Sequence, residues 1–293
     1  MTDPAARRKF LGGAKRLVVK LGSSLLAPAS RAERRARLRA LAEQIAALRR
    51  GGRDVVLVSS GAIASGMRLL GVKRRPAGVV AQQALAGIGQ PELMRAYAEA
   101  FARHRMPVAQ VLVTRDDLRD PRRRRNARRA LGELLRLGTV PVVNENDTVA
   151  VEEIRMGDND LLSAYVTLLS DADALILLTD VDGLYDGHPR RSPSAARLGV
   201  VRAVSPAVRR LAGRAPGSEV GSGGMRTKIE AAGLATRAGH AVLIARGNDR
   251  RVLLRALAGE DLGTLFLPAG RRLSRRERGK IVQLQSRTRR TSS

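Results

Sequence analysis

The stretch GSGGMRTKIEAAG, residues 221–233, has the residue types and spacing of a phosphate-binding turn. Glycines precede a helical pattern, so their backbone amides can point inward, and the helix N-terminus adds a partial positive charge. Lys228 falls in the first turns of this helix and can reach the same anion. A flexible glycine linker before a helix is the alternative. We favour a bound phosphate group.

Lys20 lies in the apolar segment VVKLGSS, near the end of an expected strand. A buried ammonium group is costly unless it meets an anion, and the alternative is a lysine on an exposed sheet edge. Because only six of the 54 basic residues are lysines, one kept in such a setting stands out. Lys20 and Lys228 together could neutralise a phosphoryl group in transfer, where electrostatic positioning provides most of the catalysis.

Acidic and amide side chains crowd into NENDTVAVEEIRMGDND, residues 144–160, although the formal net charge of the chain is +27. Three interpretations are open: a metal site, an acidic flap over a basic partner, and a pocket for a small cationic group. The central residues 148–157 alternate like a short hairpin. The carboxylates are Glu145, Asp147, Glu152, Glu153, Asp158 and Asp160.

Small polar residues follow two further apolar segments. SSGAIASG (59–66) follows an expected strand and opens a helix, so it could hold a carboxylate or phosphate, although small residues also permit tight turns. In TDVDGLY (179–185), Asp180 or Asp182 could contact a ribose or an amine, and the alternative for Asp182-Gly183 is a simple turn. Since ligands of open α/β sheets bind outside the carboxyl ends of the strands, these residues indicate one ligand site.

Six short segments rich in Val, Leu and Ile are typical of strands buried on both faces. Helix-length stretches such as residues 91–104, 126–138, 160–171 and 228–239 alternate with them. This alternation predicts an α/β fold with a mainly parallel sheet and helices on both faces. Residues 182–224, with one short helix in SPAVRRLAG, are expected to form a mobile flap. The expected strands lie within residues 16–24, 54–61, 107–115, 140–147, 173–180 and 241–249.

The strong positive charge raises nucleic-acid binding as an alternative function. The arginines are spread along the chain, which we interpret as a compositional habit, and their clusters at residues 31–40, 120–129 and 270–280 as solvated faces or a tail. Aromatic residues make up only 2%, so base-stacking platforms are poorly supplied. We therefore expect no specific nucleic-acid partner.

Composition also limits the class of protein. No apolar run reaches the roughly 18 to 20 residues that span a bilayer, and the N-terminus has no continuous apolar signal segment. The chain has no cysteine, and its three histidines follow no metal-ligand spacing, so we expect no metal site in the protein itself. A cytoplasmic protein with no membrane partner is the expectation.

Seven segments together resemble the glutamate 5-kinases of the amino acid kinase family. The resemblance runs from about residue 15 to residue 268, and other members of the fold do not combine NENDTVA, GDND and SSGAIA. It implies an αβα sandwich around a mainly parallel sheet. It also implies transfer of the γ-phosphoryl group of ATP to the side-chain carboxylate of L-glutamate, the first step of proline biosynthesis. The segments are VVKLGSS, VSSGAIASG, QQALAGIGQPELM, VVNENDTVA, MGDNDLLSA, LLTDVDGLY and GSGGMRTKIEAAG.

Roles for individual residues follow from this resemblance. Lys20 and Lys228 would stabilise the phosphoryl group in direct in-line transfer, Asp158 would orient these lysines, and Mg²⁺ would arrive with ATP. Asp147 and Asp160 would meet the ammonium group of glutamate. The implied glutamate-binding residues are Ser60, Gly61, Ala62, Asn144, Asp147, Asn159 and Asp160. The implied nucleotide-binding residues are Lys20, Gly22, Ser23, Thr179, Asp180, Ser222, Gly223, Gly224, Met225, Arg226, Thr227 and Lys228.

The resemblance also implies a homo-oligomer (dimer or tetramer), feedback inhibition by proline, and handover of the product to glutamyl phosphate reductase. We expect an N-terminal tail over residues 1–14, an amino acid kinase domain over residues 15–268, and a basic, partly disordered tail over residues 269–293. That last segment is too short for the C-terminal PUA domain that bacterial members often carry. A kinase of another small carboxylate, such as acetylglutamate, is the alternative within the fold.

Overall fold

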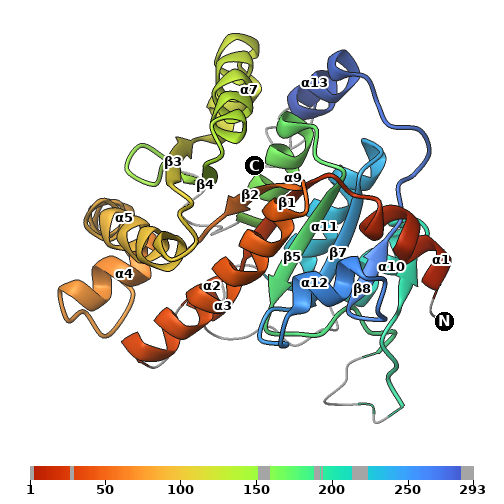
Figure 1. Ribbon diagram of the computed structural model, residues 1–293, viewed down its shortest axis with the longest axis horizontal. Coiled ribbons are helices and arrows are strands. Elements are labelled where there is room, and N and C mark those ends of the chain that lie inside the picture. The colour runs from red at the N-terminus through yellow and green to blue at the C-terminus, as the bar shows by residue number, and fades with distance from the viewer. Residues whose placement is uncertain are drawn as a thin grey trace.

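The computed structural model describes residues 3–26, 30–150, 159–187, 192, 194–212 and 224–284. Its centre is an eight-stranded sheet with the strand order β3-β4-β2-β1-β5-β7-β8-β6 (Figure 1). The first six strands in this order pair in parallel, β8 runs antiparallel to β7, and β6 is parallel to β8. The strands are β1 (Arg16–Leu21), β2 (Asp54–Val58), β3 (Val108–Val113), β4 (Val140–Glu145), β5 (Ala174–Thr179), β6 (Val200–Val201), β7 (Ala241–Arg246) and β8 (Thr264–Phe266).

Helices cover both faces of this sheet, so the predicted αβα sandwich is confirmed. One hydrophobic cluster joins one face to α3, α5 and α12, and a second joins the other face to α7, α9 and α11. None of the helices in the described residues is long and apolar enough to cross a membrane. The helices are α1 (Pro4–Arg7), η1 (Arg8–Gly12, a π-helix), α2 (Ser23–Leu26), α3 (Arg31–Arg50), α4 (Ala62–Leu69), α5 (Val79–Ala102), α6 (Arg115–Arg119), α7 (Pro121–Arg136), α9 (Asn159–Ser170), α10 (Pro206–Ala212), α11 (Met225–Arg237), α12 (Val252–Leu257) and α13 (Arg275–Leu284).

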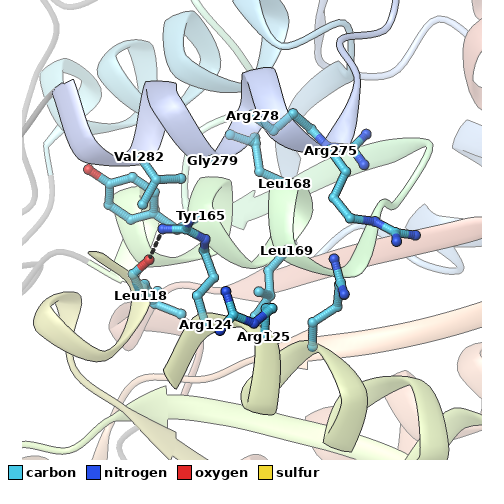
Figure 2. Close-up of a pocket in the computed structure, with 11 residues that line it drawn as sticks. Leu118, Arg124, Arg125, Tyr165, Leu168, Leu169, Arg275, Arg278, Gly279 and Val282 are labelled. Carbon is cyan, nitrogen blue, oxygen red and sulfur yellow. Dashed lines mark hydrogen bonds between the residues drawn. The ribbon is translucent and has the colours of Figure 1, made fainter. Parts of the chain in front are cut away.

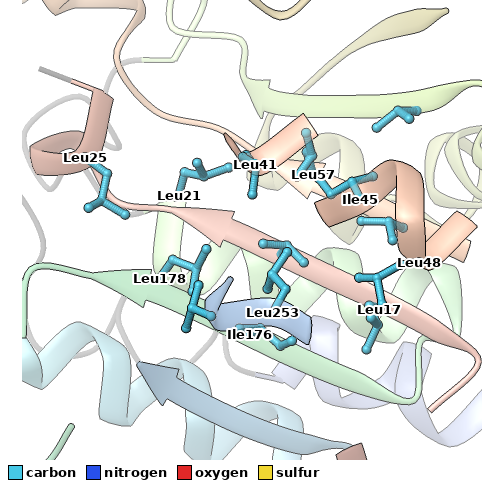
Figure 3. Packing of buried hydrophobic residues seen from close by; sticks show 14 of the residues in the cluster. Leu17, Leu21, Leu25, Leu41, Ile45, Leu48, Leu57, Ile176, Leu178 and Leu253 are labelled. Carbon is cyan, nitrogen blue, oxygen red and sulfur yellow. The ribbon is translucent and has the colours of Figure 1, made fainter. Parts of the chain in front are cut away.

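Successive residues of the central strands pack on opposite faces. In β1, Leu17 and Leu21 belong to the cluster under α3, as Figure 3 shows, whereas Val18 belongs to the cluster under α9. The neighbouring strand β5 divides in the same way, with Ile176 on the first face and Leu177 on the second. Both faces are buried, which explains why these strands are near-continuous apolar runs in the sequence.

Helices α4 and α5 cross unusually closely. A Cβ atom at Gly66 would lie 2.0 Å from the Leu85 carbonyl oxygen, and one at Gly89 would lie 1.9 Å from the Ala62 carbonyl oxygen. The sequence predicted a helix over residues 91–104, starting at Pro91, but α5 begins at Val79 and contains Pro91. Its first half is stabilised by this contact with α4, which the local sequence pattern does not reveal.

The N-terminal residues are part of the domain, so the prediction of a tail over residues 1–14 is wrong for residues 4–12. Leu11 is fully buried in the core. The buried Arg7 guanidinium donates hydrogen bonds to the carbonyls of Leu262 (2.7 Å) and Gly199 (2.8 Å) and pairs with Asp261 (2.8 Å). Arg7 thus satisfies backbone acceptors beside the antiparallel strand β8 and holds the chain start there.

Three other predicted segments are covered only in part. At the C-terminus, α13 is ordered and its Arg278 and Val282 are buried, while residues 285–293 lie outside the described residues. The predicted hairpin over residues 148–157 also lies mostly outside them. Within the predicted flap, α10 confirms the helix in SPAVRRLAG, and the mobility of the flap stays a prediction.

Candidate active site

Three ionised side chains meet where β1, α9 and α11 come together. Asp160, in the first turn of α9, lies between Lys20 of β1 (Nζ–Oδ1 2.5 Å) and Lys228 of α11 (Nζ–Oδ2 3.1 Å). Asp160 is fully buried, and both lysines are only 5% exposed. We refer to these three residues as the charged centre. The structure thus brings together the two lysines that the sequence singled out.

Electrostatics keep the carboxyl group of Asp160 ionised. Burial alone would raise the pKa of Asp160, but the ammonium groups of Lys20 and Lys228 outweigh it and hold that pKa well below its usual range. Among the described residues, two ammonium groups face one carboxylate, and the N-terminus of α11 adds a partial positive charge. The site is therefore suited to a phosphoryl group that carries negative charge.

From the sequence, Asp158 was expected to orient the lysines and Asp160 to meet the ammonium group of glutamate. Asp160 contacts both lysines, so its assignment to the ammonium group of glutamate is corrected, while the role of Asp158 stays a prediction. Asp158 itself lies outside the described residues. The physical reason is helix phase: because α9 begins at Asn159, Asp160 falls in its first turn and faces the sheet.

The predicted nucleotide-binding residues are partly assembled around this centre. Gly224 is the N-cap of α11, and the Thr227 hydroxyl lies 2.8 Å from Asp160 Oδ2. At the ends of the adjacent strands, the backbone amide of Gly22 bonds to the Leu178 carbonyl (3.0 Å) and the Thr179 hydroxyl donates to Asp180 (2.9 Å).

The remaining residues of that prediction have mixed outcomes. Ser23 opens the short helix α2 directly after Gly22. Met225 is buried in the core beneath α11, whereas the exposed Arg226 pairs with Glu230 (3.3 Å). Both side chains therefore make structural contacts, Met225 in the core and Arg226 within α11. Ser222 and Gly223 lie outside the described residues.

A network of neutral polar side chains lies on the other side of the charged centre. The Asn159 amide group lies within hydrogen-bond distance of the Ser60 hydroxyl and Asn144 Oδ1 (both 2.9 Å) and of the Ser59 carbonyl (2.6 Å). Asn144 in turn donates to Gln90 Oε1 of α5 (2.9 Å). We refer to Ser60, Gln90, Asn144 and Asn159 as the amide network. It fixes three of the predicted glutamate-binding residues relative to one another.

Sequence reasoning missed Gln90. It is 8% exposed and belongs to QQALAGIGQPELM, a segment that was recognised as a motif without a role being assigned to it. The signal that could have identified it is a polar residue directly after Gly89, where α5 packs closely against α4. Gln90 thereby connects the close helix crossing to the site.

Asp147, after β4, is half-buried, and burial raises its pKa to about 6 although Arg75 acts in the opposite direction. A carboxylate that is poorly solvated in this way gains from an incoming cation. Gly61 is the N-cap of α4 with φ +99°, a left-handed conformation that favours glycine, and it is followed by the buried Ala62. These two residues shape the turn after β2 and offer no charged group.

In the described part of the chain, no group of three or more His, Asp or Glu side chains is placed to hold a metal ion. Both oxygens of Asp160 face ammonium groups, which is the chemistry of a counter-ion. The buried His240 places Nδ1 2.6 Å from the Ala172 carbonyl, and burial lowers its pKa to about 4, so it is a neutral structural residue.

Comparison with solved structures supports the fold. A carbamate kinase from Giardia lamblia bound to AMP-PNP superposes with a TM-score of 0.63 at 15% identity, over 87% of this chain and 99% of that one. A UMP kinase from Bacillus anthracis gives a TM-score of 0.57 at 16% identity, over 88% and 97%. At such low identity the likeness concerns the fold alone.

Sequence comparison is more specific. Residues 15–246 match the amino acid kinase family. A glutamate 5-kinase from Halorhodospira halophila is 49% identical over 282 residues, which are 96% of this chain and 75% of that protein. One from Herpetosiphon aurantiacus is 50% identical over 263 residues, or 90% and 71%. The chain belongs to the amino acid kinase family and, within it, to the glutamate 5-kinases.

Proposed function

We propose that this protein transfers the γ-phosphoryl group of ATP to the side-chain carboxylate of L-glutamate and forms L-glutamyl 5-phosphate, the first step of proline biosynthesis. In the reaction, a carboxylate oxygen forms a new bond to the γ-phosphorus, the bond from that phosphorus to the β-phosphate oxygen breaks, and ADP leaves. No covalent intermediate with the protein is required.

The observation that carries this proposal is the charged centre. Lys20 and Lys228 approach from different elements and are locked by one buried carboxylate, Asp160. Charge on the equatorial oxygens of the transferred phosphoryl group is then met by two ammonium groups that are already in position. Because they need no reorganisation during the reaction, their effect is larger than that of mobile surface lysines.

The acceptor is held on the other side of the centre. Asp147 receives the α-ammonium group of glutamate, while Ser60 and Asn159 offer neutral donors to its carboxylates. A neutral amide suits this task, because it binds a carboxylate without reducing its nucleophilicity as strongly as a full positive charge would. The charged centre and the amide network meet at two consecutive residues, Asn159 and Asp160, so donor and acceptor converge there.

ATP is held at the N-terminus of α11 by Gly224 and Lys228 and beside β5 by Thr179 and Asp180. The donor set fits a nucleotide, since backbone amides and ammonium groups are the usual phosphate ligands. Magnesium supplied with ATP neutralises phosphate charge. We assign the ion to the nucleotide, with which it would enter the site.

Acetylglutamate is the competing acceptor within the fold. Acetylation makes the amino nitrogen neutral, so the modified substrate offers no cation to Asp147, whose raised pKa marks a carboxylate without a strong counter-ion. A site that holds a poorly solvated carboxylate for an ammonium group rejects an analogue without it. Asp147 therefore favours glutamate over acetylglutamate.

Purified protein incubated with Mg-ATP, glutamate and hydroxylamine should form the hydroxamate that traps an acyl phosphate. Acetylglutamate in place of glutamate should give a rate at least about a hundredfold lower. Hydroxamate formation that does not depend on glutamate, or that is faster with acetylglutamate, would refute the assignment. Asp116→Asn, an exposed substitution in α6, is a control for general damage.

The remaining parts of the proposal rest on the family and on the composition of the chain. They are a cytoplasmic homo-oligomer, feedback inhibition by proline, handover of the labile product to glutamyl phosphate reductase, and no specific nucleic-acid partner. Size-exclusion chromatography with light scattering, and the hydroxamate assay with added proline, test the first two directly.

A further inference from the structure

Two arginine-rich segments that are far apart in the sequence meet at one crevice. Arg124, Arg125 and Arg128 come from α7, and Arg275 and Arg278 come from α13, on either side of the second half of α9 (Figure 2). The sequence analysis interpreted both segments as solvated faces or a tail. The structure instead places them around an apolar floor that includes Leu118, Leu168, Leu169 and Val282. We refer to this feature as the arginine crevice.

The charges of the arginine crevice are poorly compensated. Arg278 pairs with Asp171 at 2.5 Å. In the described ranges of the chain, the other four arginines have no carboxylate within 4.0 Å. Burial and then the neighbouring guanidinium groups, Arg275 first among them, lower the pKa of Arg128. The cluster therefore costs stability through mutual repulsion, which an incoming anion would relieve.

Two of these arginines are fixed in position. Arg278 is 6% exposed, and its buried Nε atom has no hydrogen-bond partner in the described part of the structure. Arg124 is held by the carbonyls of Leu118 (3.1 Å) and Arg119 (3.0 Å), the first of which is drawn in Figure 2. A Cβ atom at Gly279 would lie 3.0 Å from Arg124 Nη2, so the glycine in α13 makes room for this guanidinium.

The size of the crevice limits what can enter. Its volume is about 40 Å³, which corresponds to roughly three waters at 10 to 15 Å³ each. A phosphate group fits such a space, whereas a whole nucleotide does not. Guanidinium groups bind phosphate oxygens in a bidentate manner, and Arg125, Arg128 and Arg275 are available at the rim for further charge.

We propose that the arginine crevice binds one phosphate group of a small, multiply charged phosphate compound, at a site separate from the active site. The two sites lie at opposite ends of α9: Asn159 and Asp160 at its start and Leu168 and Leu169 near its end, about 12 Å apart at 1.5 Å per residue. A small ligand is favoured over a nucleic acid because the five arginines line one hollow of only about 40 Å³.

The test is calorimetric titration with inorganic pyrophosphate of the wild type and two matched double variants. Arg128→Gln/Arg275→Gln changes the crevice, and Arg122→Gln/Arg276→Gln removes the same charge from the same helices outside it. In the wild type we expect binding at the active site and at the crevice. The crevice variant should lose the second event or weaken it at least tenfold, while the control should change less than twofold.

Three results would overturn the proposal. The first is equal weakening in both variants, which indicates general attraction to a basic surface. The second is identical titration of all three proteins. The third is a crevice-dependent affinity for a single-stranded RNA oligonucleotide at 0.15 M salt without any for pyrophosphate, which indicates a nucleic-acid surface. Wild-type hydroxamate rates at saturating ATP and glutamate would show that the crevice variant is folded.

Pyrophosphate should also bind at least tenfold more tightly than inorganic phosphate at the crevice, because the rim arginines contact the second phosphate. Equal affinities would contradict a multiply charged ligand. In the absence of ligand, the crevice variant should unfold at the same temperature as the wild type or higher, since like charges have been removed. Pyrophosphate should then raise the unfolding temperature of the wild type more than that of the crevice variant.

Discussion

The charged centre and the amide network meet at Asn159 and Asp160, yet they differ in every physical respect. The charged centre consists of ionised groups and carries a positive excess, whereas the amide network is neutral and is held by hydrogen bonds of 2.9 Å. We propose that the first stabilises the charge that develops during transfer and that the second determines the geometry of the acceptor. On this proposal, two consecutive residues of one helix affect different kinetic constants, kcat for Asp160 and KM for Asn159.

The largest expected effect is that of Asp160→Asn. It removes the only carboxylate that contacts both Lys20 and Lys228 in the described structure, and it leaves two buried ammonium groups that repel each other. We expect kcat in the hydroxamate assay to fall by about a thousandfold or more, and stability to fall by about 3 to 5 kcal/mol, as for other broken buried ion pairs. If Asp160→Asn instead has a normal kcat and a raised glutamate KM, Asp160 acts in glutamate binding and not in stabilising the transferred phosphoryl group, which would contradict its assigned role.

Next in size is Asn144→Ala, which separates Asn159 from Gln90. Each buried polar group left without a partner costs about 1 to 3 kcal/mol, so the glutamate KM should rise tenfold to hundredfold. We expect kcat to stay within about fivefold of the wild type. The exposed Gln110 accepts a longer hydrogen bond (3.3 Å) from Gln90. Gln110→Ala should therefore change the glutamate KM less than threefold.

The support of the amide network can be tested through stability. Gly89→Ala inserts a methyl group 1.9 Å from the Ala62 carbonyl oxygen, so α4 and α5 must separate. The free energy of unfolding in urea should fall by about 1 to 3 kcal/mol. Gly132→Ala, in an open position of helix α7, should instead raise it by up to about 1 kcal/mol. Equal effects of the two substitutions would show that the crossing is not tight.

The smallest expected effect concerns pH. The pKa of Asp147 is raised to about 6 in the free protein, and an ammonium ligand favours the ionised carboxylate. Glutamate affinity should therefore be complete above pH 6 and weaken about tenfold for each pH unit below it. Steady-state KM between pH 5 and pH 8 measures this. A flat profile in the wild type, or the same profile in Asp147→Asn, would disprove the role of this residue.

Much of the fold could be predicted from sequence because its signals are local. Six apolar runs gave six of the strands, and Lys20 and Lys228 stood out through their apolar or glycine-rich surroundings. The two remaining strands, β6 and β8, have only two and three residues and produce no pattern. Arg7 bonds to carbonyls that are about 190 to 260 positions away, so no window of sequence contains its partners.

The roles of residues in the candidate site have the same limit, because they depend on contacts that the local sequence does not contain. GDND contains two aspartates separated by one residue, and the motif alone does not say that Asp160 contacts the lysines. That contact depends on where α9 begins, which is a property of the folded chain. The arginine crevice could not be predicted either. Each arginine-rich segment, in α7 or in α13, looks like an ordinary solvated pattern by itself, and only the folded chain places the two around one crevice.

The central claim is that the charged centre stabilises the phosphoryl group in transfer and does not bind glutamate. Lys228→Met keeps the length and apolar stem of the side chain and removes its charge. Calorimetric titration with glutamate should give a dissociation constant within about threefold of the wild type, while hydroxamate turnover falls about a thousandfold. A comparable loss of glutamate affinity in this variant would contradict the division between the two halves of the site.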